Sequence, residues 1–449
     1  MAYNEQSISL KYVQKFGPEL ERAVVAALNW PGGRDRVVYY QHEELRLKYD
    51  LQVDAYYPNA ATPQVFVSVT YCEPDKPGHS NENKLQLKLG ELMLLKARFP
   101  EIASVLVIGG NRETWLPYVL KAFQFFFDRT IFAWEEGFDV AIAELRDKPT
   151  SVVRKHEEVW RQLAAEWSAV KLWSGVPITS SLRRSMWEEM SGIGCEGQLP
   201  ADVSNEVFHH CMRAAFDRHK ATRGRSGKEW SNYINNNWAK LWQSRSYFNP
   251  AEAAIQLSLD KAGLAYKGGL ARDEPVPSLI HHLGGKEVDN TKVSEDFVLY
   301  SQALDMPVFI QSKATGGGEA EHGKNIQNRA KEQVARSLFY RGGLDAEGNI
   351  VIRPKDYYWI GILDGNWGVT KKSPLKYLHM LQWAGYNALF PADSLVNDDL
   401  SLRDVNSSLL IQELRRIDCI ADPGVFSRKW GEWRRTRMYS DSDEFTLTP

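Results

Sequence analysis

The chain of 449 residues carries 55 Lys and Arg against 57 Asp and Glu, a net charge of −2, and 43% of its residues are hydrophobic. The length allows roughly two or three domains, each with a hydrophobic core. The balanced charge excludes a protein that binds nucleic acid through one overall basic field, so any such binding must come from local basic patches. The four scattered cysteines lack CxxC pairing and argue against a disulfide scaffold and a structural zinc site, and the lack of a signal core or an apolar run of about 18 residues predicts a soluble, cytoplasmic protein.

The first 150 residues are predicted to form an α/β block. Alternating or continuous apolar runs bounded by turn residues indicate strands, and apolar residues at helical spacing indicate helices. In chain order the pattern predicts a helix over Pro18–Leu28, strands over Leu51–Tyr57 and Val65–Tyr71, a helix over Glu82–Ala97, a buried strand over Ser104–Ile108 and a helix over Trp115–Phe127.

Residues 151–248 are predicted to be helical and to contact DNA. Apolar residues at helical spacing cover 153–173 and 181–190. From Cys211 to Arg245, eight Lys and Arg residues are opposed by only two acids and are interleaved with Trp, Asn and Gln. Lys and Arg suit phosphate contacts, whereas Arg, Asn and Gln can read base edges. The alternative is a solvated helical face with a flexible loop. The residues expected to contact DNA here are Arg223, Arg225, Lys228, Asn235 and Asn236.

Residues 249–395 are predicted to form a second α/β block with the same order of elements. The pattern predicts a helix over Pro250–Ala262, a β-hairpin from Asp296 to Lys313, a helix over 323–340, a strand over Tyr357–Leu363 and a helix over Pro374–Ala384. Asp54 and Thr70 are 16 positions apart in the first block, and Asp296 and Lys313 are 17 apart in the second. We therefore expect two copies of one core, a hypothesis that rests on order and spacing and not on residue identity.

The hairpin of the second block carries the motif on which the functional prediction depends. Asp296 opens its first strand, and its second strand ends on Gln311-Ser312-Lys313, followed by a polar, Gly-rich loop and a helix with basic and amide side chains. This layout resembles the PD-(D/E)XK nuclease core, in the Asp…Gln-X-Lys variant of Mrr-like restriction enzymes, over about residues 250–365 and more weakly over 18–128. The resemblance implies an α/β fold with a restriction-endonuclease-like core, a mixed central sheet flanked by helices, and a second, degenerate copy at the N-terminus.

Phosphodiester hydrolysis explains why these residue types stand together. The reaction needs a nucleophilic water and a stabilised leaving oxygen, and Mg²⁺ with oxygen ligands supplies both. Asp296 would supply a carboxylate, Gln311 an amide oxygen and Ser312 its main-chain carbonyl. Lys313 shares a strand face with the glutamine and could orient or deprotonate the water and offset negative charge in the transition state. The alternative is a strand-end aspartate beside a surface lysine.

A glutamine in place of the motif's acid removes one negative charge, so another acid is expected to compensate. Glu252, on the helix before the hairpin, is the catalytic candidate, and Glu295 is the second choice, expected to face away from the site. On the helix that follows the Gly-rich loop, Lys324, Gln327 and Arg329 are expected to contact DNA phosphates.

The first block lacks the motif's lysine. Ser68 and Thr70 occupy the positions of the glutamine and the lysine, and a hydroxyl carries no positive charge. The alternative to a second active site is a degenerate copy used for packing, dimerisation or DNA contact, and from the sequence we expect this block to support rather than to cut. The following helix offers two lysines and two acids as replacements: Lys84, Lys88, Glu82 and Glu91.

Residues 396–449 are predicted to hold an amphipathic helix over Leu400–Ile417 and a basic segment over Ser427–Arg437. The segment carries five Lys and Arg residues together with Trp430 and Trp433. It could clamp the DNA backbone, and the alternative is a surface segment packed by its tryptophans.

The motif and its surroundings predict a Mg²⁺-dependent, sequence-specific endonuclease of double-stranded DNA, a type II restriction enzyme from which a cognate methyltransferase protects host DNA. Cutting a duplex takes two cuts, and one intact motif is visible per chain, so a homodimer is expected. A modification-dependent, Mrr-like restriction enzyme is the near alternative. Two further alternatives are a non-catalytic DNA-binding protein with a decayed nuclease fold and a nuclease that acts on RNA or on repair intermediates.

Overall fold

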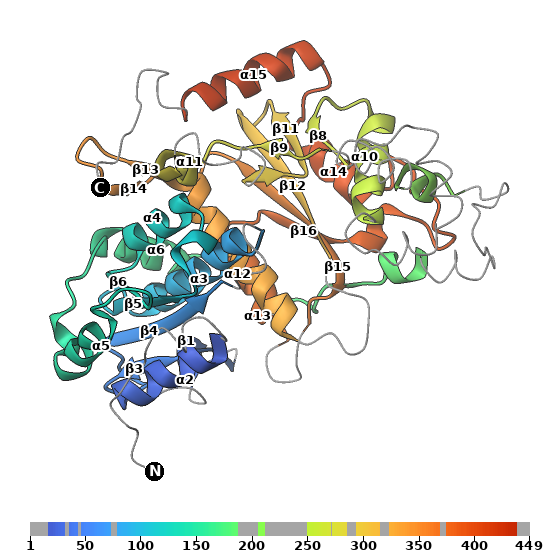
Figure 1. Ribbon diagram of the computed structural model, residues 1–449. Helices are drawn as coiled ribbons and strands as arrows, with labels where there is room; N and C mark the ends of the chain where they lie inside the picture. The colour runs from blue at the N-terminus through green and yellow to red at the C-terminus, as the bar shows by residue number, and fades with distance from the viewer. Residues whose placement is uncertain are drawn as a thin grey trace, which may run out of the picture.

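The computed structural model describes residues 17–31, 36–43, 46–72, 79–186, 205–211, 249–270, 272–284, 293–314, 323–368 and 374–437. These residues form a mixed α/β protein, as the sequence predicts, with two main sheets in two adjoining blocks (Figure 1). Within the described ranges, no helix has both the length and the apolar composition that a membrane crossing requires.

The sheet of the first block has the strand order β3–β4–β5–β6, with β3 antiparallel to β4 and the other pairs parallel. Its strands are β3 (Ala55–Tyr57), β4 (Val65–Tyr71), β5 (Ala103–Gly109) and β6 (Arg129–Phe132), and its helices are α2 (Gly17–Leu28), α3 (His79–Arg98), α4 (Pro117–Phe126) and α5 (Phe138–Asp147). Val67 and Val105 share a core cluster with α2 and α5, whereas Phe66 and Leu106 share another with α3 and α4. The parallel strands are therefore apolar on both faces because helices cover both.

In the described residues, the six-stranded sheet of the second block has the order β16–β15–β12–β11–β8, with β11 antiparallel to both β12 and β8 and with β12, β15 and β16 parallel. Its sixth strand, β7 (Thr179–Ser180), pairs antiparallel with the end of β15. Its strands are β8 (Lys267–Gly268), β11 (Phe297–Ser301), β12 (Met306–Ala314), β15 (Tyr358–Asn366) and β16 (Ala388–Pro391), and its helices are α10 (Pro250–Ala262), α12 (Gly323–Arg341), α13 (Lys376–Ala384), η4 (Ala392–Leu395) and α14 (Leu409–Arg416). Ile310 and Ile360 share a core with α10 and α14, and Phe309 and Trp359 share one with α12 and α13.

The two blocks repeat one topology. The series α2, β3, β4, α3, β5, α4, β6 in the first block matches α10, β11, β12, α12, β15, α13, β16 in the second, and the strand pairings have the same directions. The order proposed from the sequence is therefore present in the folded chain. The boundary of one strand differs, because the run predicted over 51–57 is divided at Val53 and Asp54 into β2 (Leu47–Gln52) and β3.

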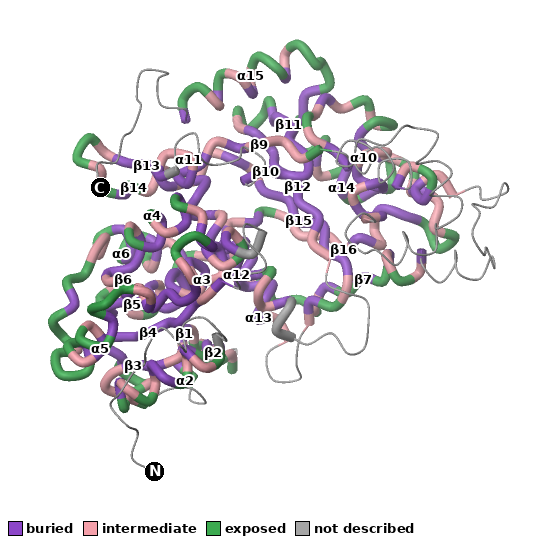
Figure 2. Tube along the Cα trace, viewed as in Figure 1, coloured by how far each residue is buried: buried purple, intermediate pink, exposed green. Residues whose placement is uncertain are grey.

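The equivalent helices α3 and α12 pack against each other and join the two blocks (Figure 1). Gly90 of α3 lies so close to α12 that a Cβ there would be 2.4 Å from the main-chain oxygen of Lys331. Any larger residue would force the helices apart. The largest core cluster contains residues of both blocks. Because helices cover both faces of each sheet and α3 packs on α12, the layers follow the order helix, sheet, helix, helix, sheet, helix, with the buried strands inside (Figure 2).

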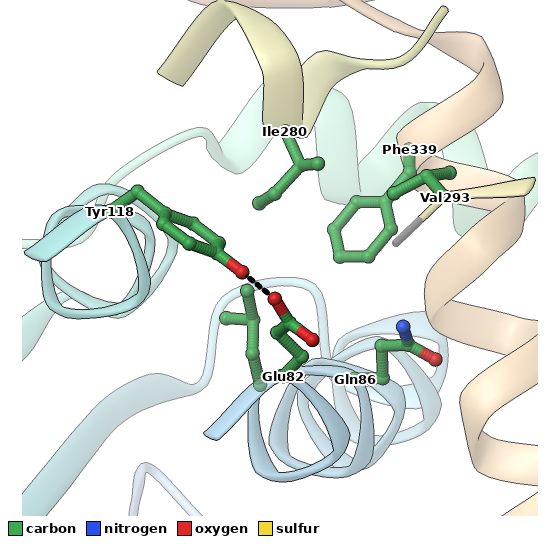
Figure 3. A pocket seen from close by; sticks show the side chains of 7 residues that line it. Glu82, Gln86, Tyr118, Ile280, Val293 and Phe339 are labelled. Atoms are coloured by element: carbon green, nitrogen blue, oxygen red, sulfur yellow. Dashed lines mark hydrogen bonds between the residues drawn. The ribbon is translucent and has the colours of Figure 1, made fainter. Parts of the chain in front are cut away.

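A small pocket lies between the blocks beside this helix pair (Figure 3). Inside it the Tyr118 hydroxyl donates a hydrogen bond to the carboxylate of Glu82. Glu82, one of the acids considered for the first block, therefore takes part in the boundary between the blocks. The lining residues are Glu82, Leu85 and Gln86 of α3, Tyr118 of α4, Ile280 of α11 (Leu279–Gly284), Phe339 of α12, and Val293.

Residues 182–186, within the helix predicted over 181–190, are helical, and several shorter elements lie elsewhere in the described chain. They are β1 (Arg36–His42), η1 (Arg112–Thr114), η2 (Pro149–Ser151), α6 (Glu157–Ser168), β7 (Thr179–Ser180), β9 (Glu274–Pro275), β10 (Ser294–Glu295), β13 (Gly342–Leu344), β14 (Ile350–Ile352) and α15 (Pro423–Arg435). The helices predicted over 153–173 and 400–417 are shorter, since α6 and α14 are all that forms there. Trp430 and Trp433 of α15 are buried, as the packing interpretation of the basic tail expects, while Arg428 and Arg435 are exposed.

Candidate active site

Asp296 lies between β10 and β11, at the start of the predicted hairpin. Its Oδ2 accepts a hydrogen bond of 2.5 Å from the main-chain N–H of Ser312 on the neighbouring strand. The backbone at this point is held by the residue after β8, because Gly269 N donates to the Asp296 carbonyl at 2.7 Å. Gly268 has φ +91°, and a Cβ there would lie 2.3 Å from the same carbonyl oxygen, so only glycine permits this approach. The aspartate is 8% exposed and held in one position.

Gln311 and Lys313 lie on one face of β12, as residues two apart on a strand must. The Gln311 amide matches its neighbours when its oxygen faces Arg336 Nη1 at 2.6 Å and Lys313 Nζ at 3.0 Å. Its nitrogen then faces Gln333 Oε1 at 2.6 Å and the Tyr386 hydroxyl at 3.0 Å. The structure therefore brings the predicted glutamine and lysine together and adds three polar side chains from α12 and the turn after α13.

Arg336 connects the hairpin to the strand before it. Its Nη1 donates to the carbonyl of Ser294 at 2.7 Å and lies 3.5 Å from Glu295 Oε1. Glu295 is fully buried and also accepts hydrogen bonds from the Tyr340 hydroxyl and, at 3.2 Å, from Trp359 Nε1. Glu295, the second choice for the compensating acid, therefore faces α12 and forms a buried ion pair with Arg336 beneath the site.

Burial sets the protonation of this cluster. It raises the pKa of Asp296 to about 6 and that of Glu295 to about 7, against the opposing effect of nearby cations. Burial also lowers the pKa of Lys313, and the positive charge of Arg336 lowers it further, although Asp296 acts in the other direction. Both changes favour uncharged forms, so protons can be exchanged within the cluster closer to neutral pH than on free side chains.

Glu295→Gln is expected to remove a pH-dependent loss of stability. Because folding raises the pKa of Glu295, the folded chain keeps this proton after the unfolded chain has released it. Wild-type stability should therefore fall relative to the variant as pH rises from about 4.5 to about 7, by up to ~1.4 kcal/mol per pH unit from this group. Urea denaturation at a series of pH values measures the difference, and a difference that does not change with pH would contradict the assignment.

Glu252 reaches the hairpin through the cap of α10. Asn249 Oδ1 accepts from Glu252 N at 3.3 Å, and Asn249 Nδ2 donates to the Glu252 carboxylate. The Ser312 hydroxyl lies 3.5 Å from Asn249 Oδ1. Since Ser312 points to the opposite face of β12 from Gln311 and Lys313, Glu252 lies at the end of the hairpin on its other side.

The residues predicted to contact DNA are described only in part. Gln327 and Arg329 lie on α12, half-buried and exposed respectively, and Arg329 Nη1 pairs with Glu332 Oε2 at 3.2 Å. Lys324 lies in the first turn of α12, and its side chain is outside the described part. Five more residues lie outside the described ranges: Arg223, Arg225, Lys228, Asn235 and Asn236.

The fit of these residues to Mg²⁺ can be judged from their hydrogen bonds. Asp296 and Glu252 offer the carboxylate oxygens that Mg²⁺ prefers. The Gln311 oxygen already accepts from two cationic groups, so it suits a cation only if Arg336 or Lys313 turns away. In the part of the chain that the structure describes, no group of three or more His, Cys, Asp or Glu side chains is arranged to hold a metal ion. Asp296 is thus the ligand that fits best, and Glu252 lies at the same end of the hairpin but on its other face.

Arg336, Gln333 and Tyr386 are site residues that the sequence interpretation did not assign. Gln333 and Arg336 are three apart on α12, the spacing that places side chains on one helix face. That spacing, on the helix expected after the hairpin, was the available signal. Tyr386 follows α13 and offers none, because only tertiary packing brings it to β12.

Comparisons of the chain with protein-family models, with curated proteins and with solved structures give no match. The chemistry of the site therefore has to be inferred from the cluster itself. That cluster joins a buried carboxylate, an amide and an amine at the end of one hairpin, with an arginine and a second carboxylate behind them.

Proposed function

We propose that the chain is a Mg²⁺-dependent endonuclease of double-stranded DNA whose second block has the PD-(D/E)XK fold. The observation that carries the proposal is the meeting of Asp296, Gln311 and Lys313 at the end of the β11–β12 hairpin. The order of strands around that hairpin supports it, because one antiparallel pair is followed by a helix and two parallel strands. A type II restriction enzyme protected by a cognate methyltransferase is the form that we propose, with a modification-dependent enzyme as its near alternative.

The residues divide the work of hydrolysis between them. When bound, Mg²⁺ polarises the phosphate and lowers the pKa of a water molecule. Asp296 would hold the metal, with Glu252 as a second acid, and the hydrogen bond from Ser312 N keeps the Asp296 carboxylate in place. Lys313 stands beside Asp296, and because burial lowers its pKa it can accept a proton from the attacking water and then offset charge on the phosphate.

Two buried donors support a site that takes up an oxygen-rich ligand. Within the described residues, Gln333 Nε2 and Arg336 Nε have no hydrogen-bond acceptor. Buried donors without acceptors are uncommon in folded proteins, since each costs about 1–3 kcal/mol. A phosphate oxygen or an ordered water would satisfy them. Both donors belong to side chains that contact Gln311.

One observation favours a different class, a DNA-binding protein with a decayed nuclease fold. Arg336 and Lys313 both donate to the Gln311 oxygen. At this position the related motif has an acid that binds the metal, whereas here two basic side chains occupy the oxygen. A protein of this class would bind DNA both with Lys313 present and with Lys313 substituted. Neither form would cut the DNA.

Cleavage of plasmid DNA separates the two classes. Unmodified and methylated plasmids are incubated with Mg²⁺ and with wild-type, Asp296→Asn or Lys313→Ala protein. Discrete fragments from the wild type alone support a sequence-specific nuclease with this site. Equal cutting by all three proteins would remove Asp296 and Lys313 from the mechanism. Binding without cutting on any DNA would favour the non-catalytic class.

A further inference from the structure

The first block repeats the contact that fixes the aspartate of the candidate site. Asp54 stands between β2 and β3, and its Oδ2 accepts a 2.6 Å hydrogen bond from Val69 N on β4. Asp296 accepts the equivalent bond from Ser312 N on β12. Val69 therefore matches Ser312 in space, and the residue before it, Ser68, takes the place of the glutamine, as the spacing predicts.

An amine of the protein itself is the cation at this place in the first block. Lys88 Nζ of α3 donates to Ser68 Oγ at 2.6 Å and lies 3.9 Å from Asp54 Oδ2. It also donates to Glu91 Oε2 at 3.1 Å, and the Ser68 hydroxyl donates to the same oxygen at 3.3 Å. We call these four residues the Asp54 cluster. Because its carboxylates already face a lysine, the cluster is a closed ion network that joins α3 to β4.

The two other residues of α3 that the sequence offered as replacements make different contacts. Lys84 Nζ donates to the carbonyl of Tyr71 at the end of β4. Glu82 accepts from the Tyr118 hydroxyl in the pocket between the blocks (Figure 3). The charged groups of α3 that face Asp54 are therefore those of the Asp54 cluster.

The Asp54 cluster reaches the second block through Glu91. Lys331 of α12 extends across the helix pair, and its Nζ donates to Glu91 Oε1 at 2.7 Å. The side chains of Glu91 and Lys331 are only 16% and 7% exposed, so water screens this ion pair weakly. Burial alone would raise the pKa of Glu91, but Lys331 and Lys88 outweigh burial and lower that pKa to about 2. Glu91 is therefore charged at neutral pH, and each of its two oxygens accepts from a lysine of a different block.

The residue before Glu91 holds the main chain of the same residue of α12. Gly90 lies against the carbonyl of Lys331, which a Cβ at position 90 would approach to 2.4 Å. Two consecutive residues of α3 therefore contact Lys331, one at its main chain and the other at its amine. The main-chain contact limits how closely α12 can approach α3. The ion pair opposes rotation of α12 about its axis, because such a rotation would draw the amine away from the carboxylate.

The other side of α12 carries the two side chains that hold Gln311. Gln333 Oε1 lies 2.6 Å from the Gln311 amide nitrogen, and Arg336 Nη1 lies 2.6 Å from the amide oxygen. Residues two apart on an α-helix point to nearly opposite sides, which is why Lys331 contacts α3 while Gln333 contacts β12. The helix thus lies between α3 and the hairpin, and a rotation that moves Lys331 also moves the groups that hold Gln311. The Gln311 oxygen in turn accepts from Lys313 Nζ at 3.0 Å, so the effect extends to the lysine of the motif.

We propose that Glu91 of the first block is a positioning residue for the candidate site of the second block. Its ion pair with Lys331 sets the rotation of α12, and that rotation holds Gln333 and Arg336 against Gln311. This inference rests on the proposed function. The Asp54 cluster then anchors the helix that serves the cutting site, which gives a physical form to the supporting role expected of the first block.

Glu91→Gln is expected to lower the maximal rate of plasmid cleavage by about 10–100-fold, since a displacement of about 1 Å at a reacting group can cost that much. Supercoiled plasmid is mixed with increasing concentrations of protein in Mg²⁺ and followed over a single turnover. The protein concentration that gives the half-maximal rate should stay at the wild-type value, because the residues assigned to DNA contact are unchanged. Wild-type cleavage by the Glu91→Gln protein would overturn the proposal.

Glu144→Gln is the matched control for this experiment. Glu144 lies on α5, is exposed, and pairs with Arg129 Nη2 at 3.3 Å. The same change of an acid to an amide is thereby made in the same block, at an ion pair on the surface. This protein should cut at the wild-type rate, and an equal loss in both variants would overturn the role given to Glu91.

A double-mutant cycle with Gln333→Leu tests whether Glu91 acts through α12. Leucine at position 333 removes the amide that holds Gln311 and keeps a similar volume. If Glu91 positions Gln333, part of what Glu91→Gln removes is already absent from the Gln333→Leu protein. The double variant should therefore cut faster than the product of the two single losses predicts, by more than about twofold, the margin within which separate sites act independently. Losses that multiply within that margin would overturn the proposal, even if the Glu91→Gln protein cuts slowly.

The same cycle on the unfolding equilibrium separates this inference from the proposed function. Urea denaturation without DNA or Mg²⁺ gives the unfolding equilibrium constants of the wild type, the two single variants and the double variant. Gln333→Leu should raise the unfolding constant by a smaller factor in the Glu91→Gln background than in the wild type. If no protein cuts DNA but this coupling is present, the positioning role stands and the nuclease function falls. If the wild type cuts and both cycles show independent effects, the positioning role alone falls.

Lys331→Met provides a second variant in case Glu91→Gln does not fold. It removes the same ion pair from the side of α12, keeps the apolar stem of the lysine, and leaves Glu91 paired with Lys88 at 3.1 Å. Circular dichroism and the thermal unfolding midpoint identify a variant that does not fold. Should Glu91→Gln fail this test, both cycles are run with Lys331→Met. Losses that multiply with those of Gln333→Leu would then overturn the proposal, and losses that overlap would support it.

Discussion

Lys313→Met is expected to lower the rate of plasmid linearisation by about 10²–10³-fold, the usual effect of removing one group that stabilises a transition-state charge. Methionine keeps most of the side-chain volume on β12 but carries neither the proton acceptor nor the positive charge. Gln311 keeps its bond to Arg336, so the hairpin should retain its shape. The measurement is single-turnover cleavage of supercoiled plasmid, with linear DNA as the product scored.

Lys261→Met is the matched control for this experiment. Lys261 lies in the last turn of α10, is exposed, and pairs with Glu206 Oε1 at 2.8 Å. The same change of charge and volume is thereby made in the same block, away from the hairpin. Loss of linear product in both variants would indicate weaker DNA binding through general charge, and wild-type cleavage by Lys313→Met protein would remove the lysine from the mechanism.

The sequence predicts the hairpin well because its contacts are local. Five residues separate the end of the first apolar run, Tyr300, from Met306 of the next strand, and alternation then places Gln311 and Lys313 on one face. Apolar runs bounded by turn residues likewise predict β4, β5 and β15, which are buried on both faces. The order of these elements was enough to predict the repeat, although the residues of the two blocks differ.

The parts that the sequence does not predict depend on contacts between distant elements. Tyr386 and Arg336 reach Gln311 from elements that lie 25 or more positions along the chain, and no local pattern specifies which helix face meets the strand. Lys88 was one of four candidates on α3, and the rotation of that helix against β4 selects it. Gly90 permits the close approach of the α12 backbone to α3. The β1–β2 hairpin was missed because charged residues interrupt its alternation.

Lys96→Met is expected to destabilise the first block by about 3–5 kcal/mol, the usual cost of breaking a buried ion pair by removing one partner. Lys96 and Asp128 have no exposed side-chain surface, and Lys96 Nζ lies 3.0 Å from Asp128 Oδ2 and 2.5 Å from the carbonyl of Ile102. Methionine fills the space but leaves the carboxylate charged and without its cation. Urea denaturation followed by tryptophan fluorescence measures the loss, since Trp160 of α6 lies near this pair.

A second substitution tests whether charge or packing accounts for the loss. Asp128 also accepts from Ser104 N at 2.7 Å and from Lys155 N at 2.5 Å, so it joins β5 to the segment before α6. Asparagine at position 128 removes the charge and keeps one acceptor, so Lys96→Met with Asp128→Asn should be more stable than Lys96→Met alone. If both proteins lose the same free energy of unfolding, the shape of the lysine side chain matters more than its charge.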